Sequence, residues 1–73
     1  MPDYRIGDAG TSVTILSERA AKRGVPLHWS RGGARLAVGS TFTFPTAYEV
    51  NFFMRLREAE GYIFDGKEAL VGT

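Results

Sequence analysis

The sequence predicts a single small α+β domain in which a three- to four-stranded antiparallel sheet packs against one main helix. Two observations indicate this class. Residues 46–60 have the start signal, composition and stop signal of a helix, and short β-branched or aromatic runs lie on both sides of it. A chain of 73 residues with 44% hydrophobic residues is long enough for one folded domain and no more.

The main helix is predicted from its two ends. Thr46 and Glu49 form a capping box, in which a hydroxyl and a carboxylate each satisfy a free backbone N–H group. Pro45 disfavours helix before this point, and Gly61 supplies the left-handed stop after it. The residues between are mostly good helix formers. We therefore expect a helix over 46–60.

This helix is apolar on two sides. At about 100° per residue, two roughly opposite stripes form. One stripe contains Ala47, Val50, Phe53 and Met54, and the other contains Tyr48, Phe52, Leu56 and Ala59. A helix that is apolar on two sides needs two partners. Either the rest of the fold covers both stripes, or one stripe is kept for another molecule.

The N-terminal part divides into an arm and the start of the domain. Residues 1–11 show no apolar periodicity and predict a flexible N-terminal arm, although Tyr4 and Ile6 allow a short edge strand. The domain is expected over 12–73. A short helix near 14–23 should end at Arg23, because Gly24 follows it. Its start is ambiguous, and residues 12–16 have the β-branched composition of a strand.

The remaining strands are short. Runs at 35–38 and 41–44 flank Gly39 and Ser40, which predicts a hairpin with a type II′ turn. Phe42 and Phe44 should then pack against the main helix. Residues 62–64 are expected as another strand, and 67–70 as either a strand or a helical turn.

The composition argues against an enzyme. The sequence has no cysteine and a single histidine, His28, so nucleophilic, general-base and metal chemistry have few candidate residues. We expect no catalytic residue, no metal and no cofactor. The sequence has neither an apolar run of membrane-spanning length nor a signal peptide. We therefore expect a monomer in the cytoplasm.

The net charge is only +1, but the charges are unevenly distributed. A span without acidic residues contains the candidate basic patch, formed by Arg19, Lys22, Arg23, Arg31 and Arg35. Acidic residues gather near the C-terminus. Such a molecule can present a basic face to phosphates, with Trp29 available to stack on a base. The alternative is a solvated charged surface.

One resemblance concerns DNA binding. Residues 16–26 resemble the first helix and turn of the winged-helix proteins of the excisionase and MerR type. Residues 35–39 and 42–44, followed by a helix, resemble the wing and the helix after it. This resemblance implies a minimal DNA-binding protein. The sequence departs from the pattern at 27–33, which is short and broken by glycines where those proteins have a recognition helix.

The second apolar stripe instead favours protein binding. Tyr48, Phe52, Arg55 and Leu56 lie near one another on one side of the predicted helix, and aromatic residues and arginine dominate interface hot spots. These residues are our candidate partner-binding site. The alternative is that this side packs on the short helix, through Leu16 and Ala20.

The chain as a whole is similar in length and character to the small proteins with which phages redirect host transcription, such as the RNA-polymerase-binding protein of a Xanthomonas phage. Shared features are the short length, the absence of cysteine and catalytic groups, and the uneven charge. The resemblance implies a non-enzymatic protein in the bacterial host cytoplasm that binds RNA polymerase, inhibits host transcription initiation and promotes antitermination. It assigns no residue.

Overall fold

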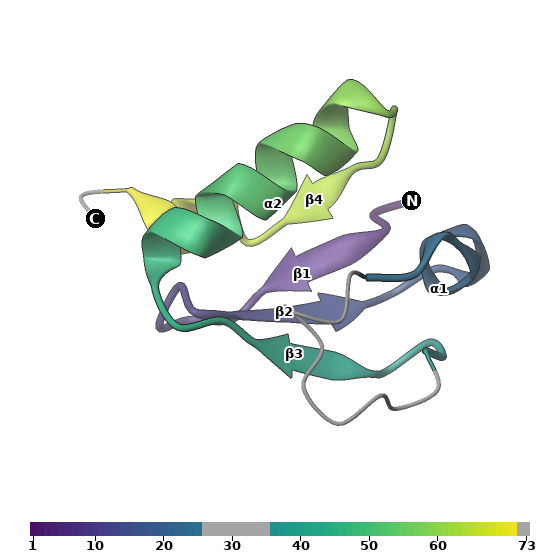
Figure 1. Cartoon of the computed structure of the whole chain (residues 1–73), viewed down its shortest axis with the longest axis horizontal. Coiled ribbons are helices and arrows are strands. Elements are labelled where there is room, and N and C mark those ends of the chain that lie inside the picture. Colours follow the sequence, from purple (N-terminus) through teal and green to yellow (C-terminus); the bar gives the residue numbers. More distant parts are fainter. Residues whose placement is uncertain (26–35, 72–73) are drawn as a thin grey trace.

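The computed structural model describes residues 1–25 and 36–71 and shows a small sheet with one long helix across it (Figure 1). In chain order the elements are β1 (Tyr4–Ile6), β2 (Ser12–Ile15), α1 (Glu18–Arg23), β3 (Thr41–Thr43), α2 (Ala47–Ala59), β4 (Phe64–Asp65) and the 3-10 helix η1 (Lys67–Leu70). The predicted α+β class is confirmed. In the described part of the chain, no helix is long and apolar enough to cross a bilayer.

The sheet is mixed, with strand order β3-β2-β1-β4. β2 runs antiparallel to both of its neighbours, whereas β1 and β4 run parallel. The expectation of a purely antiparallel sheet was therefore wrong at one edge. The reason is the connection: α2 takes the chain from β3 at one edge to β4 at the other, and a helical crossover of this length joins strands that run the same way.

The prediction of a flexible arm at residues 1–11 was wrong, because this segment contains the strand β1. Tyr4 and Ile6 are buried on either side of exposed Arg5, as in a strand with one face on the core. The ring of Tyr4 stacks on Phe64 with centroids 4.7 Å apart and meets Phe53 edge to face at 5.4 Å. The domain therefore includes the N-terminal residues, and β1 is an inner strand of the sheet.

The segment after β1 contains both elements that the sequence left open. Residues 12–15 form β2, so the strand interpretation was right, and α1 begins after Ser17 and ends at Arg23 as predicted. The Ser17 hydroxyl accepts a hydrogen bond from the Ala20 backbone N–H at 3.2 Å, which caps the helix. Ala20 is fully buried, whereas Leu16 lies before the helix.

β3 pairs with β2 and not with residues 36–38, so the predicted hairpin was wrong; residue 35 lies outside the described ranges. The turn is also one residue earlier than expected. The Ser40 N–H donates to the Ala37 carbonyl at 3.0 Å, and Gly39, with φ of 97°, occupies the third position, where a type II turn requires positive φ. Val13 of β2 lies opposite Phe42 of β3, so this pairing brings two core side chains together.

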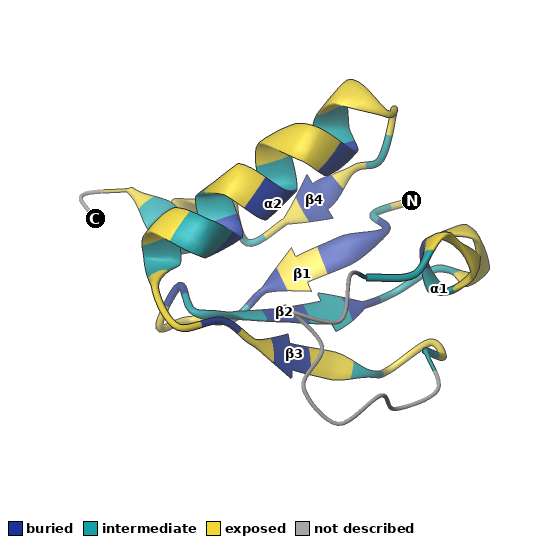
Figure 2. Cartoon of the chain, in the orientation of Figure 1, coloured by how far each residue is buried: buried dark blue, intermediate teal, exposed yellow. Residues whose placement is uncertain are grey.

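α2 confirms the prediction for 46–60. The Thr46 hydroxyl accepts a hydrogen bond from the Glu49 N–H at 3.2 Å, and Gly61 adopts φ of 96°. The first apolar stripe faces the sheet, since Val50 and Phe53 are fully buried and Phe53 lies 5.4 Å from Phe44. Figure 2 shows this division, with the buried colour on the sheet side of α2 and the exposed colour on the opposite side.

The C-terminal segment differs from prediction by a small shift. The strand expected at 62–64 is β4 at Phe64–Asp65, and residues 67–70 form the helical turn rather than a strand. Gly66 between them has φ of 79°, and a Cβ there would lie 2.5 Å from the Ile6 carbonyl oxygen. Only glycine lets the chain pass this close to β1.

Candidate protein-binding face on helix α2

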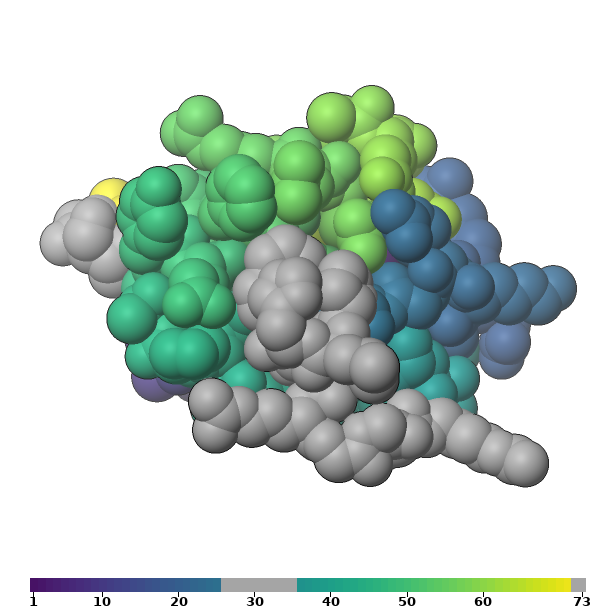
Figure 3. All heavy atoms as spheres, viewed as in Figure 1, coloured from purple at the N-terminus to yellow at the C-terminus, as the bar shows by residue number. Residues whose placement is uncertain are grey.

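The second stripe of α2 lies on the side of the helix away from the sheet. Tyr48 is 79% exposed, Phe52 50% and Leu56 40%. These exposed fractions are high for large apolar side chains in a small domain, and the three side chains lie next to one another on one helix. In the space-filling view the atoms of α2, in green, run along the upper part of the molecule (Figure 3).

The side chains on this side of the helix border a shallow hollow. It has a volume of about 350 Å³, and the described residues that line it are Tyr48, Asn51, Phe52 and Arg55. Leu56, one turn beyond Phe52, extends the same surface. We call these five residues, Tyr48, Asn51, Phe52, Arg55 and Leu56, the outer face. All four predicted partner-binding residues belong to it, and Asn51 is the residue that the sequence interpretation left out.

α1 does not cover the outer face. It lies at the C-terminal end of α2, where Arg23 binds Glu60 through two hydrogen bonds of 2.8 and 2.9 Å. Arg19 also donates to the Gly61 carbonyl at 2.9 Å. The alternative in which Leu16 and Ala20 pack on the second stripe is therefore wrong, since Ala20 is buried in the main core instead.

Two of the carboxylates near the C-terminal end of the outer face are already paired. Glu58 forms an ion pair with Lys67, and Glu60 forms one with Arg23. Arg55 is exposed and forms no ion pair within the described ranges. The outer face therefore combines two aromatic rings, an aliphatic side chain and one cation, which is the composition of an interface hot spot.

Three members of the candidate basic patch, Arg19, Lys22 and Arg23, lie in the described part of the chain, and all three are exposed. Arg31 and Arg35 lie outside the described residues. Arg19 and Arg23 are paired with Asp3 and Glu60. Their hydrogen bonds raise the pKa of both guanidinium groups. Two of the three described cations are thus occupied in holding elements together.

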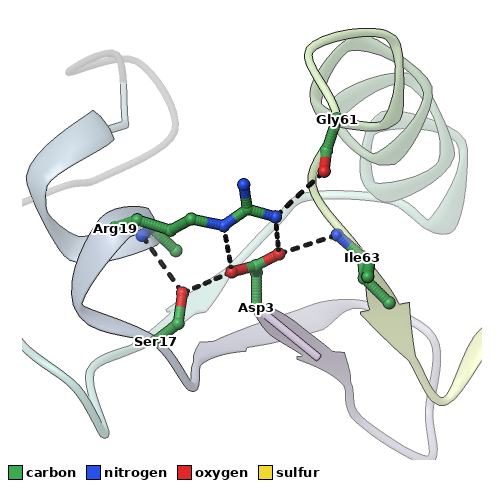
Figure 4. A network of polar contacts seen from close by, with 6 residues as sticks. Asp3, Ser17, Arg19, Gly61 and Ile63 are labelled. Carbon is green, nitrogen blue, oxygen red and sulfur yellow. Dashed lines mark hydrogen bonds and ion pairs between the residues drawn. The ribbon is translucent and has the colours of Figure 1, made fainter. Parts of the chain in front are cut away.

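Asp3 is the centre of a polar network that the sequence did not reveal (Figure 4). Its carboxylate is 2% exposed and accepts hydrogen bonds from Arg19 Nε and Nη2 at 2.8 and 2.7 Å, from the Ser17 hydroxyl at 2.5 Å and from the Ile63 N–H at 2.9 Å. The bonds from Arg19 hold the pKa of this carboxyl well below its usual range. The network joins the N-terminus, the start of α1 and the segment that leads into β4.

Arg57 is, like Asp3, a charged residue that is buried and makes contacts within the fold. It is 3% exposed, its guanidinium lies 4.9 Å from the centre of the Phe53 ring, and Nη2 donates to the Gly24 carbonyl at 3.3 Å. Neither Arg57 Nε nor the Tyr4 hydroxyl has a hydrogen-bond partner in the described structure. Burial raises the pKa of the Tyr4 phenol. The sequence signal that could have identified Arg57 is its position four residues after Phe53, on the same side of the helix.

Residues suited to chemistry are sparse within the described ranges. No three histidine, aspartate or glutamate side chains there are close enough to hold a metal ion, and His28 lies outside those ranges. The buried carboxylate, Asp3, is saturated with donors and so is a poor proton acceptor. The arrangement around α2 is suited to contact with another macromolecule.

Comparison of the chain with models of protein families, with characterised proteins and with solved structures found no match.

Proposed function

We propose that the protein is a small non-enzymatic regulator of phage type that acts in the bacterial cytoplasm by binding host RNA polymerase through the outer face of α2. Binding there inhibits transcription initiation at host promoters and promotes antitermination. The observation that supports protein binding is the contiguous exposure of Tyr48, Phe52 and Leu56 around Arg55 on the main helix. The polymerase is favoured by the resemblance in size and character to small phage regulators.

A steric mechanism is the simplest one for this geometry. The side of α2 toward the sheet is fixed by core packing, so the outer face is presented on a rigid support. A rigid helix of 13 residues can occupy a groove on a larger protein without folding first. Occupying a promoter- or factor-binding groove on the polymerase is enough to change which step of transcription proceeds.

The winged-helix hypothesis has less support. Its wing needs residues 36–38 to pair with the strand at 41–43, but that strand pairs with β2. Its phosphate contacts need Arg19 and Arg23, and both are paired with carboxylates. The segment at the position of the recognition helix, 27–33, lies outside the described residues. We therefore do not propose DNA binding as a second function.

The test is direct binding to purified polymerase. Core and holoenzyme from several bacterial lineages, Xanthomonas included, are immobilised, and binding of the protein is measured by interferometry. Because the outer face should lie inside the interface, Tyr48→Asp is expected to abolish binding, while Val38→Asp on a remote exposed turn leaves it unchanged. Circular dichroism confirms that both variants are folded.

Two results would contradict the proposal. The first is failure to bind any of the polymerases, and the second is equal binding by wild type and folded Tyr48→Asp. DNA binding whose logarithm of affinity falls steeply with the logarithm of salt concentration, without polymerase binding, would support the winged-helix reading instead.

A further inference from the structure

The outer face has an internal arrangement that indicates the shape of its partner. Residues four apart on a helix form a ridge, and neighbouring ridges enclose a groove. Tyr48, Phe52 and Leu56 form one such ridge, and Asn51 and Arg55 form the next. Among the described residues, the hollow of about 350 Å³ is lined by Tyr48, Asn51, Phe52 and Arg55, which belong to these two ridges.

The two ridges differ in chemistry. One ridge is entirely aromatic or aliphatic, whereas the other presents an amide and a guanidinium. A side chain that enters the groove therefore meets apolar atoms on one side and polar donors on the other. A groove of this kind is filled best by a ridge of a second helix that is also amphipathic, with its apolar side toward the apolar ridge and its polar side toward the polar ridge.

The charges near the groove indicate which charged group the polar side of that second helix carries. Two carboxylates at the C-terminal end of α2, those of Glu58 and Glu60, are already paired with Lys67 and Arg23, whereas Glu49 in its first turn forms no ion pair within the described ranges. Arg55 is the cation that borders the groove, and it forms no ion pair within the described ranges. The complementary group is a carboxylate, because a planar guanidinium binds carboxylate through two parallel hydrogen bonds.

We infer that the outer face binds an acidic amphipathic α-helix of its partner protein. The apolar ridge of that helix lies in the groove against Tyr48 and Phe52, and an Asp or Glu beside the ridge pairs with Arg55. Packing of two ridges formed by residues four apart gives a crossing angle of about 50° between the helix axes. This inference rests on the proposed function of the face, and it names the recognition element in the partner.

The test uses three synthetic peptides of about 18 residues, long enough for appreciable helix formation. The first is an amphipathic sequence with Leu on one side and Glu beside it. The second replaces each Glu with Lys, and the third keeps the acidic sequence but has two central residues changed to Pro, which breaks the helix. Each is titrated into the ¹⁵N-labelled protein, and amide chemical shifts are recorded.

The acidic helix is expected to shift the amides of Tyr48, Asn51 and Arg55, while the basic and proline peptides leave them unchanged. Arg55→Glu should weaken binding of the acidic peptide by about tenfold or more and restore binding of the basic one. The matched control is Val38→Ala, an exposed apolar residue away from α2, which should change neither. Equal binding of the acidic and proline peptides, or no shift with any peptide, would overturn the inference.

The outcomes separate this inference from the function it rests on. Polymerase binding that depends on Tyr48, with no response to the acidic helix, leaves the proposed function in place and removes the helix as its recognition element. Binding of the acidic helix at the groove without polymerase binding does the opposite: the groove is then a helix-binding site for a different protein.

Discussion

The two sides of α2 contain similar residues in opposite surroundings. Phe53 and Arg57 are 0% and 3% exposed, with the guanidinium packed over the ring. Phe52 is 50% exposed, and Arg55 lies beside it at the border of a hollow. The same two residue types thus pack into the fold on one side and are exposed on the other. Residue type does not separate these roles, but position around the helix relative to the sheet does.

The inner side should respond most strongly to substitution. Phe53 contacts the rings of Tyr4, Phe44 and Phe64, so Phe53→Ala leaves a cavity in the centre of the core. We expect a loss of about 3 to 5 kcal/mol in the free energy of unfolding, a large part of the total for a small domain. Urea unfolding followed by circular dichroism measures it. If Tyr48→Ala on the outer face cost as much, the two sides would not differ as the structure indicates.

Arg57→Ala should be the next largest effect. The substitution removes the buried aliphatic part of the side chain and its contact with Phe53, and it leaves the Gly24 carbonyl without this donor. We expect a loss of about 2 kcal/mol in the free energy of unfolding. Arg55→Ala is the matched control, because an exposed arginine on the same helix should change stability by no more than about 0.5 kcal/mol. Thermal unfolding of both variants checks the contrast, and equal costs would contradict it.

The sequence was most informative where structure depends on neighbouring residues. Thr46, Glu49 and Gly61 define the ends of α2 through local hydrogen bonds and backbone conformation, and the helix was predicted within one residue at each end. Four of the five residues of the outer face were named from helical periodicity, because a helix alone places them next to one another, whereas polar Asn51 was left out.

The sequence was least informative where a partner is distant along the chain. β1 is a strand because Tyr4 pairs with Ile15 and Phe64, and a three-residue strand has no periodicity of its own. Arg19 was assigned to a basic patch because no acidic residue lies between it and Arg35, although Glu18 directly precedes it. Its carboxylate partner, Asp3, is 16 residues away and becomes a neighbour only when β1 lies beside β2.

Asp3 provides a test of whether Arg19 belongs to the fold or to a basic surface. The pKa of Asp3 is lowered in the folded state, so the unfolded state binds more protons at low pH. The stabilisation is present above the unfolded pKa of about 3.9 and is lost as pH falls toward the folded value. Asp3→Asn should cost about 2 kcal/mol at pH 7 and flatten the decline of stability below about pH 4.

The control for this measurement is Asp8→Asn, on the exposed loop after β1. Chemical unfolding is followed from pH 7 to pH 2 for wild type and both variants. A decline below pH 4 that Asp3→Asn leaves as steep as in wild type would show that Arg19 is not held by this carboxylate. Arg19 would then be available to the surface, as the charge distribution in the sequence first indicated.

The smallest effect on stability should accompany the largest effect on binding. Tyr48 is 79% exposed, so Tyr48→Ala removes little that is buried and should change the free energy of unfolding by no more than about 0.5 kcal/mol. An aromatic residue at the centre of an interface contributes about 2 kcal/mol or more to binding, which is a loss of roughly 30-fold in affinity. Interferometry against polymerase and thermal unfolding, measured on one preparation, give both numbers. A variant that lost stability and binding together would place Tyr48 in the fold, and only a loss of binding alone is consistent with a side of α2 kept for another molecule.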